Sequence, residues 1–166
     1  MAKNKIIFFD TEDYELEKLE NFCDANSDCK FLKESLNSQT QITDEIKDAD
    51  IISCFTFSRV TKDVLEKFPN LKLIALRSVG FNHIDIDYCK AHKIQVVNSA
   101  GYGNITVAEF AFGLILDVTR KIARAYMNLR NEHLKNDTYA GFELNGKNLG
   151  IIGTGAIGAE LARMAK

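Results

Sequence analysis

The chain has 166 residues, about the size of one domain, and its 46% hydrophobic and 27% charged residues are typical of a soluble globular protein. A formal net charge of −2 gives no broad basic surface, so we expect no nucleic-acid partner. No apolar run approaches the roughly 20 residues that cross a bilayer, and the short apolar run near the start does not read as a secretory signal, so we expect no membrane association.

Short apolar segments alternate with helical patterns along the first part of the chain. The strands that we predict are residues 5–9, 29–36, 51–57, 71–76 and 93–97. The helices that we predict between them are residues 11–25, 42–47, 61–68 and 85–92. Asp85 is placed to cap the last of these helices. This alternation predicts an α/β fold with a flavodoxin-like, doubly wound parallel sheet and helices on both faces.

A long helical pattern follows the fifth strand, from residue 104 to about residue 130. Thr106 and Glu109 match a capping box for its first turn. Residues 107–118 are apolar nearly all round, which predicts a buried helix, whereas the second half of the pattern is basic and amphipathic.

This change of pattern marks a domain boundary near Ser99. We expect residues 1–98 to form a complete α/β domain. Residues 99–166 then hold a hinge, the long helix and the start of a second domain. Residues 131–148 are polar and are predicted to form a loop.

The cysteines Cys23, Cys29, Cys54 and Cys89 are scattered and show no Cys-x-x-Cys spacing. Zinc-binding and redox motifs are therefore unsupported. Cys54 and Cys89 lie in apolar or helical contexts, which predicts reduced, packed thiols. This use of cysteine fits a reducing cytoplasm, which is the location that we expect.

A glycine motif lies towards the C-terminal end. Residues 149–152 form a short apolar run that leads into Gly153-x-Gly155-x-x-Gly158 and then into a helix-forming segment, residues 159–166. A strand, a glycine turn and a helix start are the context of a dinucleotide-binding fingerprint. In such a motif Gly153 allows the tight turn, Gly155 the approach of a pyrophosphate, and Gly158 close packing of the helix. The alternative interpretation is a glycine-rich turn used only for packing.

Four blocks of sequence, in their order and spacing, are more specific than the glycine motif alone. They are residues 76–87 (LRSVGFNHIDID), 96–102 (VVNSAGY), 107–116 (VAEFAFGLIL) and 144–158 (LNGKNLGIIGTGAIG). With these blocks the sequence resembles the D-isomer-specific 2-hydroxyacid dehydrogenases, and most of all their D-lactate dehydrogenase branch. The resemblance implies an NAD-dependent oxidoreductase that converts a small 2-keto acid to a D-2-hydroxy acid. It also implies a substrate-binding first domain and a Rossmann second domain that binds NAD.

The resemblance carries residue roles with it. Ser78, Val79 and Gly80 are predicted to bind the substrate, with Val79 and Gly80 implied to present backbone N–H groups to its carboxylate. Tyr102 is implied to contact the substrate, and packing at the hinge is the alternative for it. This placement makes chemical sense, because ligands of open α/β sheets bind beyond the carboxyl ends of the strands. The residues implied to contact NAD are Val107, Gly153, Gly155, Ala156, Ile157 and Gly158. No residue pattern points to a metal site.

The family's catalytic residues have no counterpart in this sequence. The resemblance implies an Arg for the carboxylate, a His as general acid and base and a Glu that tunes this His, all placed after the glycine motif, whereas the sequence ends at Lys166. We therefore assign no catalytic residue and expect the 166-residue chain to be an inactive, truncated part of the enzyme. Ala156 stands where relatives often carry His or Arg, and Ala100 replaces a usual proline.

Several other polar residues have structural interpretations. His83 begins a helix-entry segment, and His92 and His133 lie in polar stretches, so surface or capping roles are favoured over chemistry. For Arg77 a structural salt bridge is favoured over a substrate contact. For Glu109 a capping role is favoured over that of a catalytic acid.

Alternative functions remain open beside the enzyme. Phe55 and Phe57 follow the third strand and are candidates to line a substrate pocket, which favours the enzyme. The apolar helix of residues 107–118 instead favours a non-catalytic, self-associating module, and we expect a homodimer. A module that only binds nucleotide is the third possibility.

Overall fold

The computed structural model describes residues 3–131 and 139–166, and the chain divides into two compact units, Met1–Ala100 and Gly101–Lys166. Each unit is described by itself below. His133, one of the histidines considered above, lies outside the described residues.

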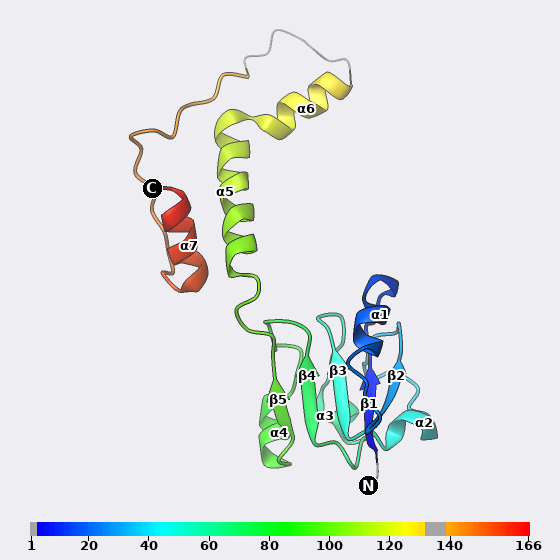
Figure 1. Ribbon diagram of the computed structural model, residues 1–166. Coiled ribbons are helices and arrows are strands. Elements are labelled where there is room, and N and C mark those ends of the chain that lie inside the picture. Colours follow the sequence, from blue (N-terminus) through cyan, green and yellow to red (C-terminus); the bar gives the residue numbers. More distant parts are fainter. Residues whose placement is uncertain (1–2, 132–138) are drawn as a thin grey trace. The chain divides into compact units, whose positions relative to one another are not determined.

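A parallel five-stranded sheet forms the centre of the first unit (Figure 1). Its strands are β1 (Asn4–Phe8), β2 (Ser27–Phe31), β3 (Ile51–Cys54), β4 (Leu73–Leu76) and β5 (Gln95–Val97). Their order is β2-β1-β3-β4-β5, and every neighbouring pair is parallel. This is the strand order of the flavodoxin-like doubly wound fold, so the predicted α/β fold is confirmed.

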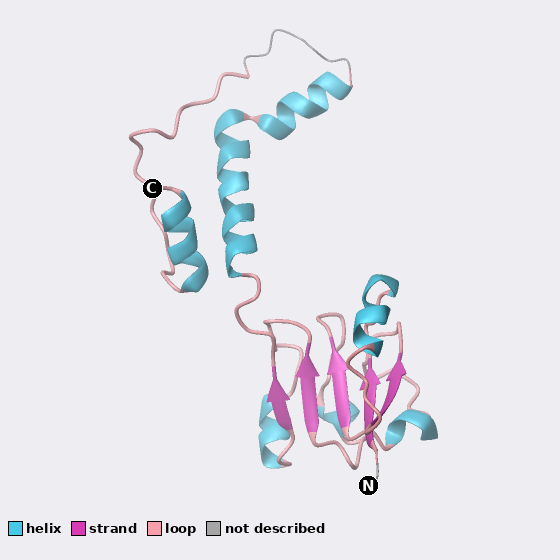
Figure 2. Ribbon diagram, viewed as in Figure 1, coloured by secondary structure: helices cyan, strands magenta, loops and turns pink. Residues whose placement is uncertain are grey.

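Four helices accompany the sheet of the first unit (Figure 2). They are α1 (Asp13–Glu20), α2 (Asp44–Lys47), α3 (Lys62–Leu65) and α4 (Ile86–Ala91). Asp85 caps α4 as predicted, because its carboxylate accepts the N–H of Tyr88 at 2.9 Å. All four are shorter than predicted, since the ends of the apolar patterns continue into turns.

The hydrophobic core of the first unit is built from the strands and from the loops and helices packed on them. Its fully buried members include Ile7, Ile52 and Ile74 from three adjacent strands, and Val64 from α3. Burying one such side chain contributes about 1.5–3 kcal/mol, so this core dominates the stability of the unit. No residue of α1 is buried, and Tyr14 is 81% exposed.

The cysteines differ in part from expectation. Cys54 and Cys89 are free and buried, as predicted, and burial raises the pKa of the Cys54 thiol to about 12, so this thiol stays protonated. Cys23 and Cys29 form a disulfide that we did not predict. Their spacing matches no metal or redox motif, and they meet only because the chain turns between α1 and β2.

The second unit contains the helices α5 (Asn104–Arg120), α6 (Ile122–Arg130) and α7 (Ala156–Met164), and α5 packs against α7. The predicted single helix over residues 104–130 is wrong, because Lys121 adopts a left-handed conformation with φ of 56°. The Asp117 carboxylate accepts the N–H of Ala123 at 2.6 Å and so caps the restarted helix. The carbonyl of Thr119, next to the break, accepts the N–H of Phe142 at 3.1 Å from the returning chain.

The start of α5 also differs from the capping-box prediction. Gly103 precedes the helix, so Thr106 lies inside its first turn and no side chain caps it. Glu109 is exposed on the same helix and has no capping role.

The predicted burial of α5 is not found in this unit. Only Ala108 and Thr119 are buried along it, whereas Phe110 is 69% exposed and Val118 is 76% exposed. The packing of α7 covers one side of α5 only.

The predicted strand over residues 149–152 is not formed either. No described strand pairs with this segment, and Ile152 is fully exposed. A strand depends on hydrogen bonds to a neighbour, whereas a helix closes its bonds within itself. Accordingly α7 forms, and it begins at Ala156, earlier than predicted.

Candidate functional site

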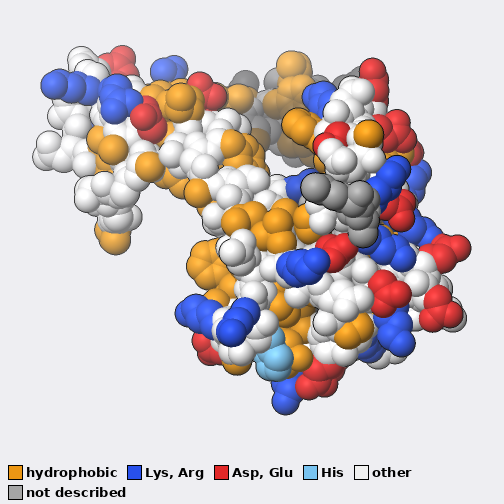
Figure 3. Space-filling model, turned by 60° about the horizontal axis from the view of Figure 1, so that its bottom comes forward, with side chains coloured by type: hydrophobic (Ala, Val, Ile, Leu, Met, Phe, Trp, Pro, Cys, Tyr) orange, Lys and Arg blue, Asp and Glu red, His pale blue; other side chains and the backbone are white. Residues whose placement is uncertain are grey.

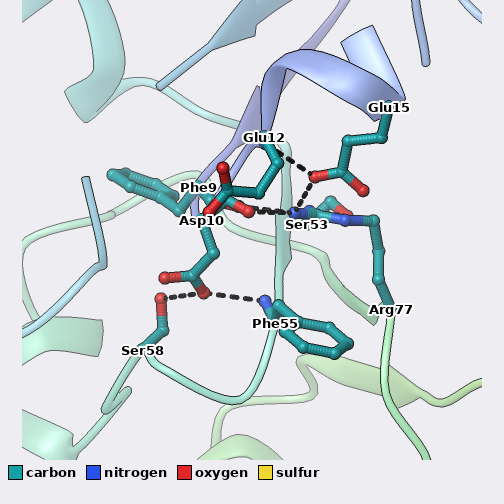
Figure 4. Close-up of polar contacts among 8 residues, drawn as sticks. All are labelled: Phe9, Asp10, Glu12, Glu15, Ser53, Phe55, Ser58 and Arg77. Atoms are coloured by element: carbon teal, nitrogen blue, oxygen red, sulfur yellow. Dashed lines mark hydrogen bonds and ion pairs between the residues drawn. The ribbon is translucent and has the colours of Figure 1, made fainter. Parts of the chain in front are cut away.

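Arg77 directly follows β4, and its side chain forms hydrogen bonds with residues of β3 and of the segment after β1 (Figure 4). Its guanidinium donates to the backbone carbonyl oxygens of Phe9 and Asp10 at 2.9 and 2.8 Å. It also donates to the Ser53 hydroxyl oxygen at 3.1 Å and pairs with the Glu15 carboxylate at 3.1 Å. Because only 16% of the Arg77 side chain is exposed, these charge-assisted bonds hold a rigid frame, and the predicted structural salt bridge is confirmed.

Asp10 is the second anchor of this frame, and sequence reasoning missed it. It directly follows β1 with a left-handed φ of 55°, and its side chain is buried. One carboxylate oxygen accepts the N–H of Phe55 at 2.8 Å and the hydroxyl of Ser58 at 2.7 Å (Figure 4). The available signal was an acidic residue directly after a buried apolar strand, a position where a carboxylate must find partners.

A cavity of about 300 Å³ lies at this edge of the sheet, lined by Asp10, Glu12, Tyr14, Glu15, Phe55, Phe57 and Arg77. The ring centroids of Phe55 and Phe57, in the wall of this cavity, are 6.0 Å apart. The structure therefore brings both phenylalanines to the carboxyl edge of the sheet, where ligands of open α/β sheets bind.

The turn of residues 78–80 leaves β4 at the same edge. Ser78 is buried, and its hydroxyl donates to the carbonyl oxygen of Gly80 at 2.8 Å, so this hydroxyl is turned inward. Val79 and Gly80 are exposed, and within the described ranges their N–H groups have no acceptor. Two adjacent, outward N–H groups are suited to bind a carboxylate.

The histidines of the first unit take no part in this turn's hydrogen bonds. His83 is half-buried, its Nε2 atom has no partner among the described residues, and burial lowers its pKa although the charge of Asp10 acts in the opposite direction. His92 is exposed, as predicted, and its ring stacks on Tyr88 at the end of α4.

The glycine motif of the second unit has the geometry that its spacing predicts. Gly153 adopts a φ of 92°, which side chains rarely tolerate. A Cβ atom on Gly158 would lie 2.0 Å from the carbonyl oxygen of Gly153, so only glycine lets the helix approach the turn. At Gly155 an added Cβ would meet nothing within 4 Å, which leaves open space before the N-terminus of α7.

The first turn of α7 faces this open space. The N–H groups of Ala156 and Ile157 have no acceptor among the described residues, as is usual at a helix N-terminus. Such N–H groups attract phosphate anions. The two other predicted contacts of this unit, Tyr102 and Val107, are 69% and 48% exposed.

A family model of the D-isomer specific 2-hydroxyacid dehydrogenases, catalytic domain, matches residues 6–156 of this chain. The chain belongs to this family. The predicted resemblance is therefore confirmed, and members of the D-2-hydroxyacid dehydrogenase family are oxidoreductases.

Individual relatives agree with this membership. A D-3-phosphoglycerate dehydrogenase of Methanocaldococcus jannaschii is 36% identical over 129 residues, which cover 78% of this chain and 25% of the relative. The 2-hydroxyacid dehydrogenase homolog 1 of Schizosaccharomyces pombe is 33% identical over 165 residues, which cover 98% of this chain and 49% of the relative. The D-lactate dehydrogenase of Aquifex aeolicus, solved with NAD and lactic acid, matches with a TM-score of 0.82 at 33% identity and covers 96% of this chain and 47% of its own.

The chain spans about half the length of the second and third of these relatives, and less of the first.

Among the described residues, no helix combines the length and the apolar character of a membrane span, and no group of His, Cys, Asp and Glu is arranged to hold a metal ion. On the face drawn in Figure 3, Lys and Arg side chains are interspersed with Asp and Glu.

Proposed function

We propose that this chain supplies the substrate-carboxylate site and the first NAD contacts of an NAD-dependent D-2-hydroxyacid dehydrogenase acting on a small 2-keto acid such as pyruvate. The observation that carries the proposal is the glycine turn before α7, where Gly155 leaves room for a pyrophosphate. The exposed N–H groups of Val79 and Gly80 support the substrate half of the proposal, because a 2-keto acid always carries a carboxylate.

The residues of the glycine turn fit NAD. Gly153 and Gly158 shape the turn, and the N–H groups of Ala156 and Ile157 would meet the phosphates. When bound, NAD supplies the hydride chemistry, and the protein contributes orientation and charge. Tyr102 as a substrate contact and Val107 beside the nicotinamide stay predictions.

The NAD half is tested by titrating the 166-residue chain with NAD and following backbone amide resonances. We expect shifts at residues 155–158 and, in Gly155→Ala, an affinity lower by about tenfold, because the methyl group occupies the space that the pyrophosphate needs. The backbone of Gly155 has a negative φ and open space at the Cβ position, so this variant keeps the fold.

The matched control is Gly113→Ala, which adds the same methyl group in open space on α5. This variant should bind NAD as the wild type does. Equal NAD affinity in Gly155→Ala and the wild type would contradict the proposed NAD site.

Catalysis by this chain alone is not part of the proposal. The family resemblance implies a catalytic Arg, His and Glu, roles that we assign to no residue of this sequence, and we propose that the 166-residue chain by itself is inactive. The measurement is oxidation of NADH in the presence of pyruvate, with the Gly155→Ala variant as the blank. NADH oxidation by the wild type clearly above this blank would contradict the expected inactivity.

Self-association through α5 is a second candidate function, and the exposure of that helix favours it. Val107, Phe110, Leu114 and Val118 recur at helical spacing and are each 48–76% exposed. A stripe of this kind is suited to pair with the same stripe of a second copy as a homodimer. Light scattering should show a mass that rises with concentration in the wild type and a monomer in Phe110→Ser; a wild-type monomer at every concentration would exclude the homodimer.

We also propose the cytoplasm as the location of this protein. The free, buried thiols of Cys54 and Cys89 support this location. The Cys23–Cys29 disulfide speaks against it, because disulfides are rare in that reducing compartment, so the proposal requires that Cys23 and Cys29 are thiols there. Labelling of these two residues by a thiol reagent, directly after cell lysis, tests the proposal.

A further inference from the structure

Each carbonyl group of the 78–80 turn accepts a hydrogen bond from a different donor. The backbone N–H of Ser99 donates to the carbonyl oxygen of Ser78 at 3.0 Å. The side-chain amide of Asn98 donates to the carbonyl oxygen of Val79 at 2.7 Å. The hydroxyl of Ser78 closes the set by donating to the carbonyl oxygen of Gly80 at 2.8 Å. The connection after β5 thus holds two consecutive carbonyls of the turn after β4, and the turn holds the third by itself.

Because peptide groups are planar, these hydrogen bonds also fix the directions of the backbone N–H groups of Val79 and Gly80. In a trans peptide the carbonyl of one residue and the N–H of the next lie in one plane and point in opposite directions. Fixing the carbonyl of Ser78 therefore fixes the N–H of Val79. Fixing the carbonyl of Val79, through Asn98, fixes the N–H of Gly80 in the same way. The Ser78 hydroxyl holds the carbonyl of Gly80, which belongs to the next peptide group, and so restrains Gly80 from its other side.

The environment of the donors adds to the constraint. Ser78 is only 2% exposed, so its hydroxyl bond is protected from competing water. At the other end of the turn, the backbone N–H of Arg77 donates to the carbonyl oxygen of Cys54 at 3.0 Å, and its side chain lies in the buried frame described above. The turn is thus fixed on both sides, while its free N–H groups remain at the surface.

We propose that Asn98 and Ser78 are positioning residues, which hold the N–H groups of Val79 and Gly80 in the direction in which they bind the substrate carboxylate. This inference rests on the substrate half of the proposed function. N–H donors that already point in the right direction bind an anion more tightly, because binding then costs less conformational entropy.

The test is a titration of the isotope-labelled 166-residue chain with pyruvate at constant ionic strength, followed through the amide resonances of Val79 and Gly80. In the wild type both resonances shift. Asn98→Ala and Ser78→Ala each weaken pyruvate binding by about tenfold, the scale of one lost hydrogen bond. In the absence of pyruvate the order parameter of the Gly80 amide falls in Asn98→Ala, since its peptide plane is no longer held.

The matched control is Thr40→Val. Thr40 is buried like Ser78, and this variant also loses a hydroxyl that donates to a backbone carbonyl, but that carbonyl belongs to Ser35, outside the turn and the Arg77 frame. A purely structural role of Ser78 would give both variants the same behaviour, whereas the proposal expects Thr40→Val to keep the wild-type affinity and order parameter. Should Ser78→Ala not fold, Asn98→Ala carries the test alone, because Asn98 is exposed.

Two outcomes separate this inference from the proposed function. Wild-type affinity and wild-type order in Asn98→Ala would overturn the positioning role and leave the carboxylate site intact. A wild-type chain whose Val79 and Gly80 amides do not respond to pyruvate would overturn the carboxylate site, and the positioning role with it.

Discussion

The two units of this chain differ in how completely their apolar side chains are buried. In the first unit Ile7, Ile52 and Ile74 lie on adjacent strands and are fully enclosed. In the second unit most residues of α5 are also apolar, yet the side chains of Phe110 and Val118 are mostly exposed. The difference shows that local turns and helices form from their own sequence, whereas strands and buried faces need partners.

The largest expected effect tests this difference directly. Ile52→Ala empties a fully buried position and should lower the free energy of unfolding by about 2–5 kcal/mol. Ile122→Ala makes the same change on α6, where the side chain is 54% exposed, and should change it by about 0.5 kcal/mol or less. Urea unfolding followed by circular dichroism measures both. Similar losses in the two variants would mean that Ile122 is covered in solution.

The second prediction compares two arginines. Arg77→Met removes the donor shared by the Phe9 and Asp10 carbonyls and should cost about 2–4 kcal/mol, because buried acceptors lose their partner. Arg163→Met removes the exposed pair with Glu160 on α7 and should cost about 0.5 kcal/mol or less. Urea unfolding followed by circular dichroism measures both free-energy changes. A small cost for Arg77→Met would show that water replaces the guanidinium in the frame.

The smallest expected effect is a pH dependence. Burial lowers the pKa of His83 below its ordinary value of 6.5, so the unfolded chain binds a proton more readily than the folded one. Stability from this group is therefore complete above about pH 6.5 and is lost as the pH falls below it. Melting temperatures between pH 7.5 and 5.5 should fall less in His83→Gln than in the wild type. An identical fall would assign the pH dependence to other groups.

The sequence was most informative where a pattern is local. Apolar runs predicted five strands in the first unit, although β2 lies at Ser27–Phe31 and not at residues 29–36, and the glycine spacing predicted the conformation at Gly153 and the close packing at Gly158. It was least informative where a distant residue decides. The break at Lys121 had no signal in an otherwise regular helical pattern, and the carbonyl of Thr119 beside it accepts the N–H of Phe142 from the returning chain.

The hydrogen bonds of Arg77 beside the candidate site also depend on residues that are distant in the sequence, and they could not be predicted from it. Arg77 read as a salt-bridge residue, but neither Glu15 nor the carbonyls of Phe9 and Asp10 were foreseeable as its partners. These contacts join residues more than 60 positions apart, and only the order of the strands brings them together. The roles of Val79 and Gly80 came from family resemblance, and their exposed N–H groups add a physical reason.

Asp10 has to meet two demands at one position, and this restricts which replacements can survive. Its left-handed backbone suits glycine, asparagine and aspartate, and penalises most other residues, β-branched ones above all. Its carboxylate must also accept from both Phe55 and Ser58. Glycine satisfies only the first demand, and glutamate can offer only the second. In a saturation library selected for folding, asparagine should thus be the most frequent survivor after aspartate itself, and valine and isoleucine should be depleted.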